Sequence, residues 1–269
     1  MADFLQNVMD HAVAVARKAG EVVCSALSDE RKIMTKSSAV DLVTQTDQRV
    51  EQLIIQSVKE KFPSHRFIGE ESVAAGESCI LTDEPTWIID PIDGTTNFVH
   101  TWRWVWSTAV WRIKCSRPGG GRERSVTARL CRFLSRQLLS DIHQAIIATE
   151  FGSNRDLKAV DHIFFSLRNI LTLPVHGVRG AGTAAVNMCL VALGCVEAYY
   201  EIGIHVWDIA AGLLIVSEAG GVLMDVTGGD VDLMSRRIVA ANNKTIAEKV
   251  IEQIDPFTPP RDDAPPLDK

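Results

Sequence analysis

The sequence of 269 residues predicts a mixed α/β fold, and three observations support this prediction. Apolar residues recur at helical spacing through the opening stretch of the chain. Short apolar runs later end in acidic residues, as residues 66–69 do before Glu70 and residues 87–89 do before Asp90. From Gly182 onwards, helical and strand-like patterns follow one another. A chain of this length forms either one large α/β domain or two modest ones.

The first part of the chain predicts two amphipathic helices joined by a loop. Residues 5–27 carry apolar side chains three and four positions apart. Residues 50–62 repeat this spacing, with Thr46 as the expected N-cap and Pro63 as the stop. Residues 28–41 between them are rich in Lys, Ser and Asp, which predicts an exposed loop.

The second half predicts elements of both kinds. In order they are a helix over 182–193, a strand over 198–202, a helix over 209–219 that Asp208 opens, a strand over 222–226, and a helix over 244–254. Residues 255–269 contain five prolines and several charges, so a disordered tail is expected there.

Charge and composition narrow the functional class and the compartment. The formal net charge of −6 argues against a general nucleic-acid binder, and a phosphate-processing enzyme of this charge needs a local positive charge such as a bound metal. Asp3 and Asp10 interrupt the apolar residues of the N-terminus, so it lacks the unbroken apolar segment of a signal peptide. No apolar run reaches the roughly 18 residues of a membrane span. The six scattered cysteines are expected to be reduced thiols. A cytoplasmic protein without a membrane partner is expected.

Acidic residues stand at strand ends and helix starts in four places. They are Glu70 with Glu71, Asp90, Asp93 and Asp208. Magnesium prefers oxygen ligands, usually a few carboxylates together with water and phosphate. Any one of these acids is most simply a turn residue or a helix cap, but all four together favour a metal site.

The segment around residue 90 has features that suit such a site. Pro91 fixes one φ angle and denies a helix through the segment, so Asp90, Asp93 and the carbonyl of Ile92 can converge on adjacent cations. The residues Gly94-Thr95-Thr96 then offer backbone N–H groups at a helix start, where phosphate binds favourably.

Two motifs in this chain resemble the signatures of the inositol monophosphatase family. The stretch WIIDPIDGTTNF, residues 87–98, resembles the first signature. WDIAAG at 207–212, followed by EAGG at 218–221, resembles the second. Gly-Glu70-Glu71 lies upstream and Gly-Thr183-Ala184-Ala lies between them, so the resemblance rests on several ordered motifs. It covers residues 1–100 and about 141–254.

The resemblance implies a fold, an activity and an assembly. The fold is a layered αβαβα sandwich of the sugar and inositol phosphatase type, with one phosphatase domain over residues 1–254. The implied activity is lithium-sensitive hydrolysis of inositol monophosphate with two or three magnesium ions, and the implied assembly is a homodimer.

The resemblance also implies roles for individual residues. One magnesium is held by Glu70, Asp90 and the carbonyl of Ile92, a second by Asp90, Asp93 and Asp208, and a third, weaker one lies near Glu70. Glu70 and Thr95 help the attacking water, and the amides of Gly94 and Thr95 cradle the phosphate. The remaining positions are those that contact or adjoin the inositol, namely Asp93, Ser153, Thr183, Ala184, Glu201 and Asp208. Asp47 lies behind the ligands, and Lys36 lies on a mobile loop.

Residues 101–140 depart from the family pattern. They hold four of the six tryptophans and nine basic residues against the single acid Glu123. Trp102, Trp104 and Trp106 alternate at strand period, so one face is able to pair with the neighbouring sheet. Nucleic-acid binding by these basic and aromatic residues is not favoured, because no stacking module accompanies them. A central sheet left incomplete by this segment is expected.

Three hypotheses about the function follow from the sequence. The leading one is magnesium-dependent hydrolysis of an inositol monophosphate. The alternative is a catalytically impaired variant that binds metal, or pairs with an intact subunit, without turnover. A third keeps the enzyme but changes the substrate to another sugar or nucleotide phosphate. His205, beside Trp207, is expected to be a packed or hydrogen-bonded histidine rather than a catalyst.

Overall fold

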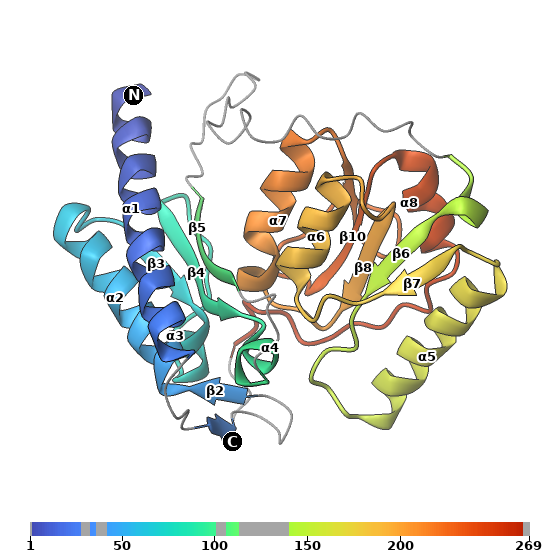
Figure 1. Ribbon diagram of the computed structural model, residues 1–269, viewed down its shortest axis with the longest axis horizontal. Helices are drawn as coiled ribbons and strands as arrows, with labels where there is room; N and C mark the ends of the chain where they lie inside the picture. Colours follow the sequence, from blue (N-terminus) through green and yellow to red (C-terminus); the bar gives the residue numbers. More distant parts are fainter. Residues whose placement is uncertain (1, 28–32, 36–41, 101–105, 113–139, 266–269) are drawn as a thin grey trace. The chain divides into compact units, whose positions relative to one another are not determined.

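The computed structural model describes residues 2–27, 33–35, 42–100, 106–112 and 140–265 (Figure 1). The chain divides into two compact units, unit 1 over Met1–Gly120 and unit 2 over Gly121–Lys269. Among the helices described, not one combines the length and the apolar character needed to cross a bilayer.

Two long helices form one layer of unit 1. Helix α1 spans Ala2–Ala26 and helix α2 spans Gln45–Lys61. Their apolar stripes, which include Val15 and Ile54, share a core with Trp87 from the neighbouring sheet. The expected N-cap at Thr46 is wrong. Thr44 caps α2 instead, because its side chain accepts a hydrogen bond from the Thr46 amide and Asp47 completes a capping box.

The sheet of unit 1 has three strands within the described residues. Strands β3 (Arg66–Gly69) and β4 (Thr86–Asp93) run parallel, and β5 (Trp106–Arg112) pairs antiparallel with β4. Strand β5 lies in the segment that departs from the family pattern, so the prediction that Trp106 pairs with the neighbouring sheet is confirmed. Trp102, Trp104 and residues 113–139 lie outside the described residues.

Short elements complete unit 1. Strands β1 (Ile33–Thr35) and β2 (Leu42–Thr44) form an antiparallel pair, so the predicted loop over 28–41 contains a strand. Helix α3 (Glu70–Ala74) follows β3 directly, and helix α4 (Thr95–Val99) follows β4 after a single residue. Both short helices therefore begin where the strands of the parallel pair end.

Unit 2 is built on a five-stranded sheet. The strands are β6 (Ile146–Thr149), β7 (Gly177–Arg179), β8 (Ala198–Ile202), β9 (Val222–Met224) and β10 (Arg237–Ala241), in the order β7-β6-β8-β10-β9. Strand β6 is parallel to β7 and β8, whereas β10 is antiparallel to both its neighbours. The sheet is therefore mixed.

Helices cover both faces of this sheet. Helices α5 (Leu157–Thr172) and α8 (Lys244–Ile251), with the short η2 (Ile142–Gln144), pack on one face, and α6 (Ala184–Ala192) and α7 (Val206–Glu218) pack on the other. Alternation along β8 explains the two cores, since Tyr200 joins the first and Tyr199 joins the second. The expected layering of helices on a mixed sheet is confirmed within unit 2.

The chain after α8 makes specific contacts, although its composition predicts disorder. His162 of α5 pairs with Asp255 over 2.7 Å, and Phe257 packs against the core beneath α5 and α8. Asp262 lies against the start of α7, with a side chain that is only 3% exposed. The composition does not reveal these contacts because each partner is distant in sequence.

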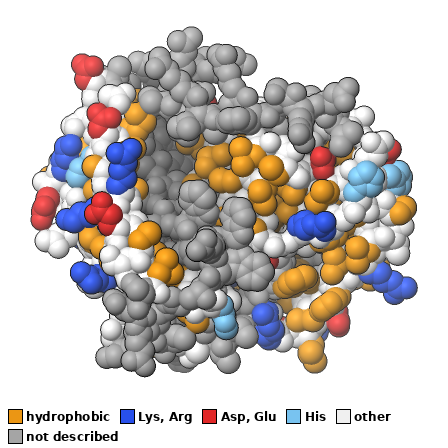
Figure 2. All heavy atoms as spheres, in the orientation of Figure 1, with side chains coloured by type: hydrophobic (Ala, Val, Ile, Leu, Met, Phe, Trp, Pro, Cys, Tyr) orange, Lys and Arg blue, Asp and Glu red, His pale blue; other side chains and the backbone are white. Residues whose placement is uncertain are grey.

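Several apolar side chains of unit 2 are exposed. Leu157, Phe164, Phe165 and Leu171 of α5 are exposed, as is Phe151 in the segment before this helix. Figure 2 shows hydrophobic side chains at the lower right, over α5, and others over α6 and α7.

Candidate metal centre

Two buried carboxylates stand at the end of β4. Asp90 is 2% exposed and Asp93 is 3% exposed, and one oxygen of each lies within 4.8 Å of the other. A register shift between these residues interrupts the pairing with β5. Two buried negative charges this close repel each other, and a divalent cation offsets the repulsion. The donor set, hard carboxylate oxygens beside the Ile92 carbonyl, suits magnesium.

The turn after Asp93 depends on a glycine. Gly94 adopts a φ of +83°, a conformation that glycine accepts without a steric penalty. This turn ends the strand and starts α4 at once, and the Phe98 amide donates to the Gly94 carbonyl at 3.0 Å. The backbone therefore reverses direction beside the two acids.

Thr95 links the turn to the start of α2. Its hydroxyl lies 3.0 Å from Asp47 Oδ1 and 3.2 Å from the Ile92 carbonyl. The other oxygen of Asp47 accepts the Thr44 amide at 2.8 Å. Because a hydroxyl has one proton to donate and two lone pairs, Thr95 remains able to accept a hydrogen bond from a water molecule.

Glu70 lies beside Asp90 because β3 and β4 are parallel. Gly69 and Ile89 are register partners, so Glu70 and Asp90 follow at the same level of the sheet. Glu70 is half-buried and opens helix α3. The expected convergence of Glu70 with the β4 acids is therefore consistent with the strand register.

A buried glutamate that the sequence analysis missed holds α3 in place. Glu51 of α2 is 3% exposed, and its carboxylate accepts the amides of Glu71 and Ser72 at 2.7 and 2.8 Å. It also accepts the Ser72 hydroxyl at 2.5 Å. A Cβ at Gly69 would lie 2.6 Å from Glu51 Cδ, so the glycine makes room for this carboxylate. The only available signal was a charged residue on the apolar face of α2.

Asp208 lies in unit 2, at the third position of α7. Its carboxylate accepts the His205 amide at 2.6 Å and is half-buried. Burial raises the pKa of Asp208, whereas the neighbouring His205 opposes that shift. His205 stacks on Trp207, with ring centroids 4.6 Å apart, and hydrogen-bonds Asp262. The prediction that His205 is packed and hydrogen-bonded is confirmed.

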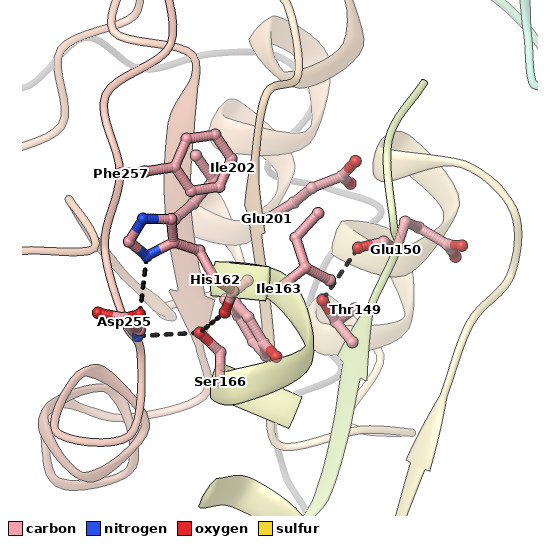
Figure 3. A pocket seen from close by; sticks show the side chains of 10 residues that line it. Thr149, Glu150, His162, Ile163, Ser166, Glu201, Ile202, Asp255 and Phe257 are labelled. Carbon is pink, nitrogen blue, oxygen red and sulfur yellow. Dashed lines mark hydrogen bonds and ion pairs between the residues drawn. The ribbon is translucent and has the colours of Figure 1, made fainter. Parts of the chain in front are cut away.

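A second pair of acids follows parallel strands in unit 2. Thr149 and Tyr200 are register partners on β6 and β8, so Glu150 and Glu201 come next at the same level. Glu150 accepts the side-chain amide of Asn187 at 2.7 Å, and burial raises its pKa. Figure 3 shows both acids lining a small pocket.

The remaining expected substrate residues are also in unit 2. Thr183 is buried and caps α6 by accepting the Val186 amide at 2.9 Å, and Ala184 is the first residue of that helix. Glu201 is buried and accepts the Tyr199 hydroxyl, while Ser153 is exposed. Lys36 lies outside the described residues.

These features define a class of protein, a layered α/β protein with clustered acids at strand ends that suit a divalent cation. The sequence profile described as "Inositol monophosphatase family" matches residues 5–106 and 122–257. The chain therefore belongs to the inositol monophosphatase family. The unmatched interval, 107–121, falls inside the predicted divergent segment and is shorter than it.

Individual relatives and structures agree with this assignment. Human inositol monophosphatase 1 is 52% identical over 275 residues, covering 98% of this chain and 99% of that protein. Human inositol monophosphatase 2 is 40% identical over 264 residues, covering 94% and 92%. The crystal structure of the extragenic suppressor protein SuhB from Bartonella henselae has a TM-score of 0.71 at 28% identity, covering 93% and 98%. A staphylococcal inositol monophosphatase, 19% identical, shares the fold with a TM-score of 0.70, covering 93% and 95%.

Proposed function

We propose that this chain hydrolyses inositol monophosphate to inositol and inorganic phosphate in a magnesium-dependent reaction. The observation that carries the proposal is the buried Asp90–Asp93 pair at the end of β4, in a chain 52% identical to human inositol monophosphatase 1. The reaction class is phosphoric monoester hydrolysis, and the cofactor is two or three magnesium ions.

The proposed ligands are the acids that the motifs single out. Glu70, Asp90 and the Ile92 carbonyl hold one magnesium, and Asp90, Asp93 and Asp208 hold a second. Bound magnesium lowers the pKa of water and neutralises charge on the phosphate oxygens. Sharing Asp90 between two ions makes it the most sensitive single ligand.

Thr95 and Glu70 are the proposed catalytic side chains besides Asp90. The Thr95 hydroxyl donates to Asp47 at 3.0 Å, which leaves its lone pairs available to accept a hydrogen bond from the attacking water. Glu70, at the start of α3, accepts a hydrogen bond from the other O–H of that water and takes its proton as the general base. The two groups together orient an oxygen lone pair of water toward phosphorus.

The proposed substrate contacts divide between phosphate and inositol. The amides of Gly94 and Thr95 bind phosphate oxygens, since they lie at the start of α4, where the first N–H groups have no acceptor within the helix. Carboxylates suit inositol hydroxyls because each accepts hydrogen bonds from neighbouring O–H groups. The residues proposed for the inositol side are Asp93, Ser153, Thr183, Ala184, Glu201 and Asp208.

Lithium sensitivity, a homodimer and a cytoplasmic location remain predictions from the resemblance and the composition. Light scattering on purified protein measures the assembly, with twice the chain mass expected. Inhibition by lithium chloride, with potassium chloride as the control salt, tests the sensitivity.

The test of the function is phosphate release from inositol 1-phosphate across a magnesium titration, on size-purified protein. We expect magnesium-dependent turnover that falls by more than about a hundredfold in Asp90→Asn, because first-sphere ligands exceed the 10–100-fold effects of outer partners. Asp10→Asn makes the same chemical change at an exposed site on α1 and is expected to leave turnover unchanged.

The impaired-variant alternative makes a different prediction. Calorimetry would then show magnesium binding to the wild-type chain while no phosphate is released from any sugar or inositol phosphate. The unmatched residues 107–121 are the observation behind this alternative. Turnover of another phosphate ester but not of inositol 1-phosphate would instead redirect the substrate assignment.

A further inference from the structure

The C-terminal tail reaches the start of α7 through one buried carboxylate. Asp262 is 3% exposed, and its Oδ2 accepts the backbone amide of Val206, the first residue of α7, at 2.8 Å. Its Oδ1 lies 2.6 Å from His205 Nδ1. The Val206 amide is one of the N–H groups that a helix leaves without an internal acceptor, and a negative charge there is favourable.

Arg236 completes this contact from the strand side. Its Nε lies 3.7 Å from Asp262 Oδ1, and it donates to the carbonyls of Gly203 and Ile204 at 2.7 and 3.0 Å. Its Nη2 also lies 3.1 Å from His205 Nε2. A guanidinium only donates, so we assign Nε2 as the acceptor and place the His205 proton on Nδ1, toward Asp262. Every polar atom of the His205 ring is thus engaged.

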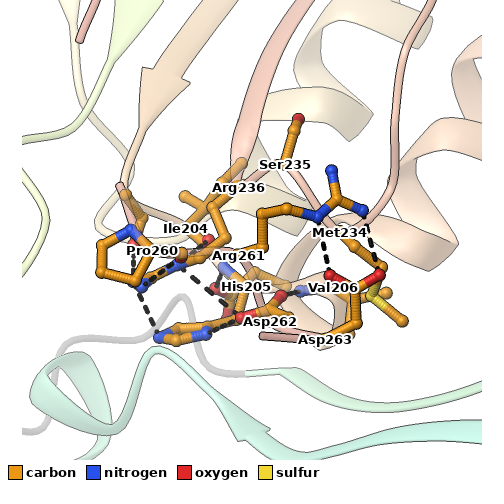
Figure 4. A network of polar contacts seen from close by, with 12 residues as sticks. Ile204, His205, Val206, Met234, Ser235, Arg236, Pro260, Arg261, Asp262 and Asp263 are labelled. Atoms are coloured by element: carbon orange, nitrogen blue, oxygen red, sulfur yellow. Dashed lines mark hydrogen bonds and ion pairs between the residues drawn. The ribbon is translucent and has the colours of Figure 1, made fainter. Parts of the chain in front are cut away.

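The tail is anchored on either side of Asp262, as Figure 4 shows. Arg236 donates to the Pro260 carbonyl at 3.2 Å, and the Asp262 amide donates to the Met234 carbonyl at 3.1 Å. Arg261 pairs with Asp232 and Asp263 at the surface. These bonds fix the backbone that carries Asp262, and they thereby fix the position of its carboxylate at the start of α7.

The contact bears directly on Asp208. The Asp208 carboxylate accepts the His205 amide at 2.6 Å, and Asp262 binds both the ring of His205 and the amide of Val206. Two bonds from Asp262 therefore hold His205 from its ring and from the peptide unit that follows it, and the backbone N–H group of the same residue orients Asp208. Asp262 is buried, so removing one of its partners leaves its negative charge less compensated.

We propose that Asp262 is a positioning residue that fixes the first turn of α7 and thereby the carboxylate of Asp208 for magnesium. The inference rests on the proposed function, in which Asp208 is a magnesium ligand. Asp262 itself is not one of the proposed magnesium ligands. Its role is comparable to that of partners that orient ligands in known metal sites, whose loss typically costs about 10–100-fold in metal affinity.

The test compares Asp262→Asn with Asp263→Asn. Asparagine keeps the shape and still accepts the Val206 amide, but it removes the charge that faces Arg236. Asp263 is the next residue and pairs with Arg261 at the surface, so its change controls for altering the tail. For each protein, the magnesium concentration at half-maximal turnover, the calorimetric magnesium affinity and the thermal midpoint without magnesium are measured.

We expect Asp262→Asn to need about 10–100-fold more magnesium, by both turnover and calorimetry, while Asp263→Asn matches the wild type. A purely structural tail contact would lower the thermal midpoint and leave the magnesium requirement within twofold, and that result would overturn the proposal. Should Asp262→Asn not fold, Asp262→Glu replaces it, because glutamate retains the charge and displaces it by one methylene. A raised magnesium requirement in Asp262→Glu supports the positioning role, and an unchanged requirement with a lower thermal midpoint overturns it.

The result separates this proposal from the function on which it rests. Wild-type turnover with an unchanged magnesium requirement in Asp262→Asn defeats the positioning role alone. A wild-type chain that binds magnesium without turnover defeats the function, and calorimetry on the variant still decides the positioning role. A wild-type chain that binds no magnesium overturns both.

Discussion

The two units secure their acidic residues by different means. In unit 1, Glu51 holds the start of α3 from a helix only 20 residues earlier in the chain than Glu71. In unit 2, Asp262 holds the start of α7 from a tail 57 residues beyond His205. Both are buried carboxylates that accept backbone amides at the first turn of a helix that carries a proposed magnesium ligand.

We call these two buried carboxylates, Glu51 and Asp262, the clamps of unit 1 and unit 2. They differ in the kind of structure that carries them. The clamp of unit 1 is supplied by α2, a long helix whose apolar stripe is part of the core. The clamp of unit 2 comes from irregular chain, which is held by side-chain bonds to Arg236 and Asp232. Under the proposed function, the geometry of the unit 2 ligand depends on the irregular segment 260–263, whereas that of the unit 1 ligand depends on a helix of the core.

The acids after the parallel strands also differ between the units. Asp90 and Asp93 approach within 4.8 Å of one another, a spacing that suits a shared cation. Glu150 instead accepts a hydrogen bond from the side-chain amide of Asn187, and Glu201 accepts one from the Tyr199 hydroxyl. The acids at the strand ends of the two units thus have different neighbours: another carboxylate in unit 1, and hydrogen-bond donors in unit 2.

The largest effect is expected from removing the clamp of unit 1. Glu51→Ala leaves the amides of Glu71 and Ser72 without their acceptor, and each buried unsatisfied group costs about 1–3 kcal/mol. We expect a loss of roughly 3 kcal/mol in the free energy of unfolding, measured with urea.

Glu60→Ala is the matched control, because Glu60 is an exposed glutamate on the same helix. A change below about 0.5 kcal/mol is expected there. Equal effects of the two substitutions would show that the Glu51 clamp contributes little, and the comparison between the units would fail.

A smaller effect is expected at the turn between β4 and α4. Gly94→Ala forces a side chain into a φ of +83°, which costs about 1–2 kcal/mol. The strain also displaces Thr95 from Asp47, so turnover should fall more than stability alone explains. Gly229→Ala is the control, because a Cβ there meets nothing within 4 Å. Unchanged turnover in Gly94→Ala would mean that this turn does not position Thr95.

The sequence predicts the part of the site that is contiguous. Asp90, Ile92, Asp93, Gly94 and Thr95 stand within six residues, and the proline and glycine among them indicate a turn with free amides. The sequence also predicts the amphipathic helices and the alternating strands, because their hydrophobic periods follow from local backbone geometry.

The sequence does not predict the long-range contacts. From the sequence, Glu51 is predicted to be an ordinary charged residue of a helix, and Asp262 is predicted to be part of a disordered, proline-rich tail. Their roles depend on bonds to Ser72 and Val206 that form only when distant segments meet. The cap of α2 was misplaced by two residues for a different, local reason, since Thr44 and Thr46 are chemically equivalent candidates.

The proposed ligand set predicts that Asp93 and Asp208 hold the same magnesium. Calorimetric magnesium affinity is measured for the wild type, Asp93→Asn, Asp208→Asn and the double variant. If both acids bind one ion, the losses are strongly non-additive, and the double variant binds little worse than the weaker single variant. Losses that add within about 0.5 kcal/mol would place the two acids at independent sites and contradict the shared magnesium site.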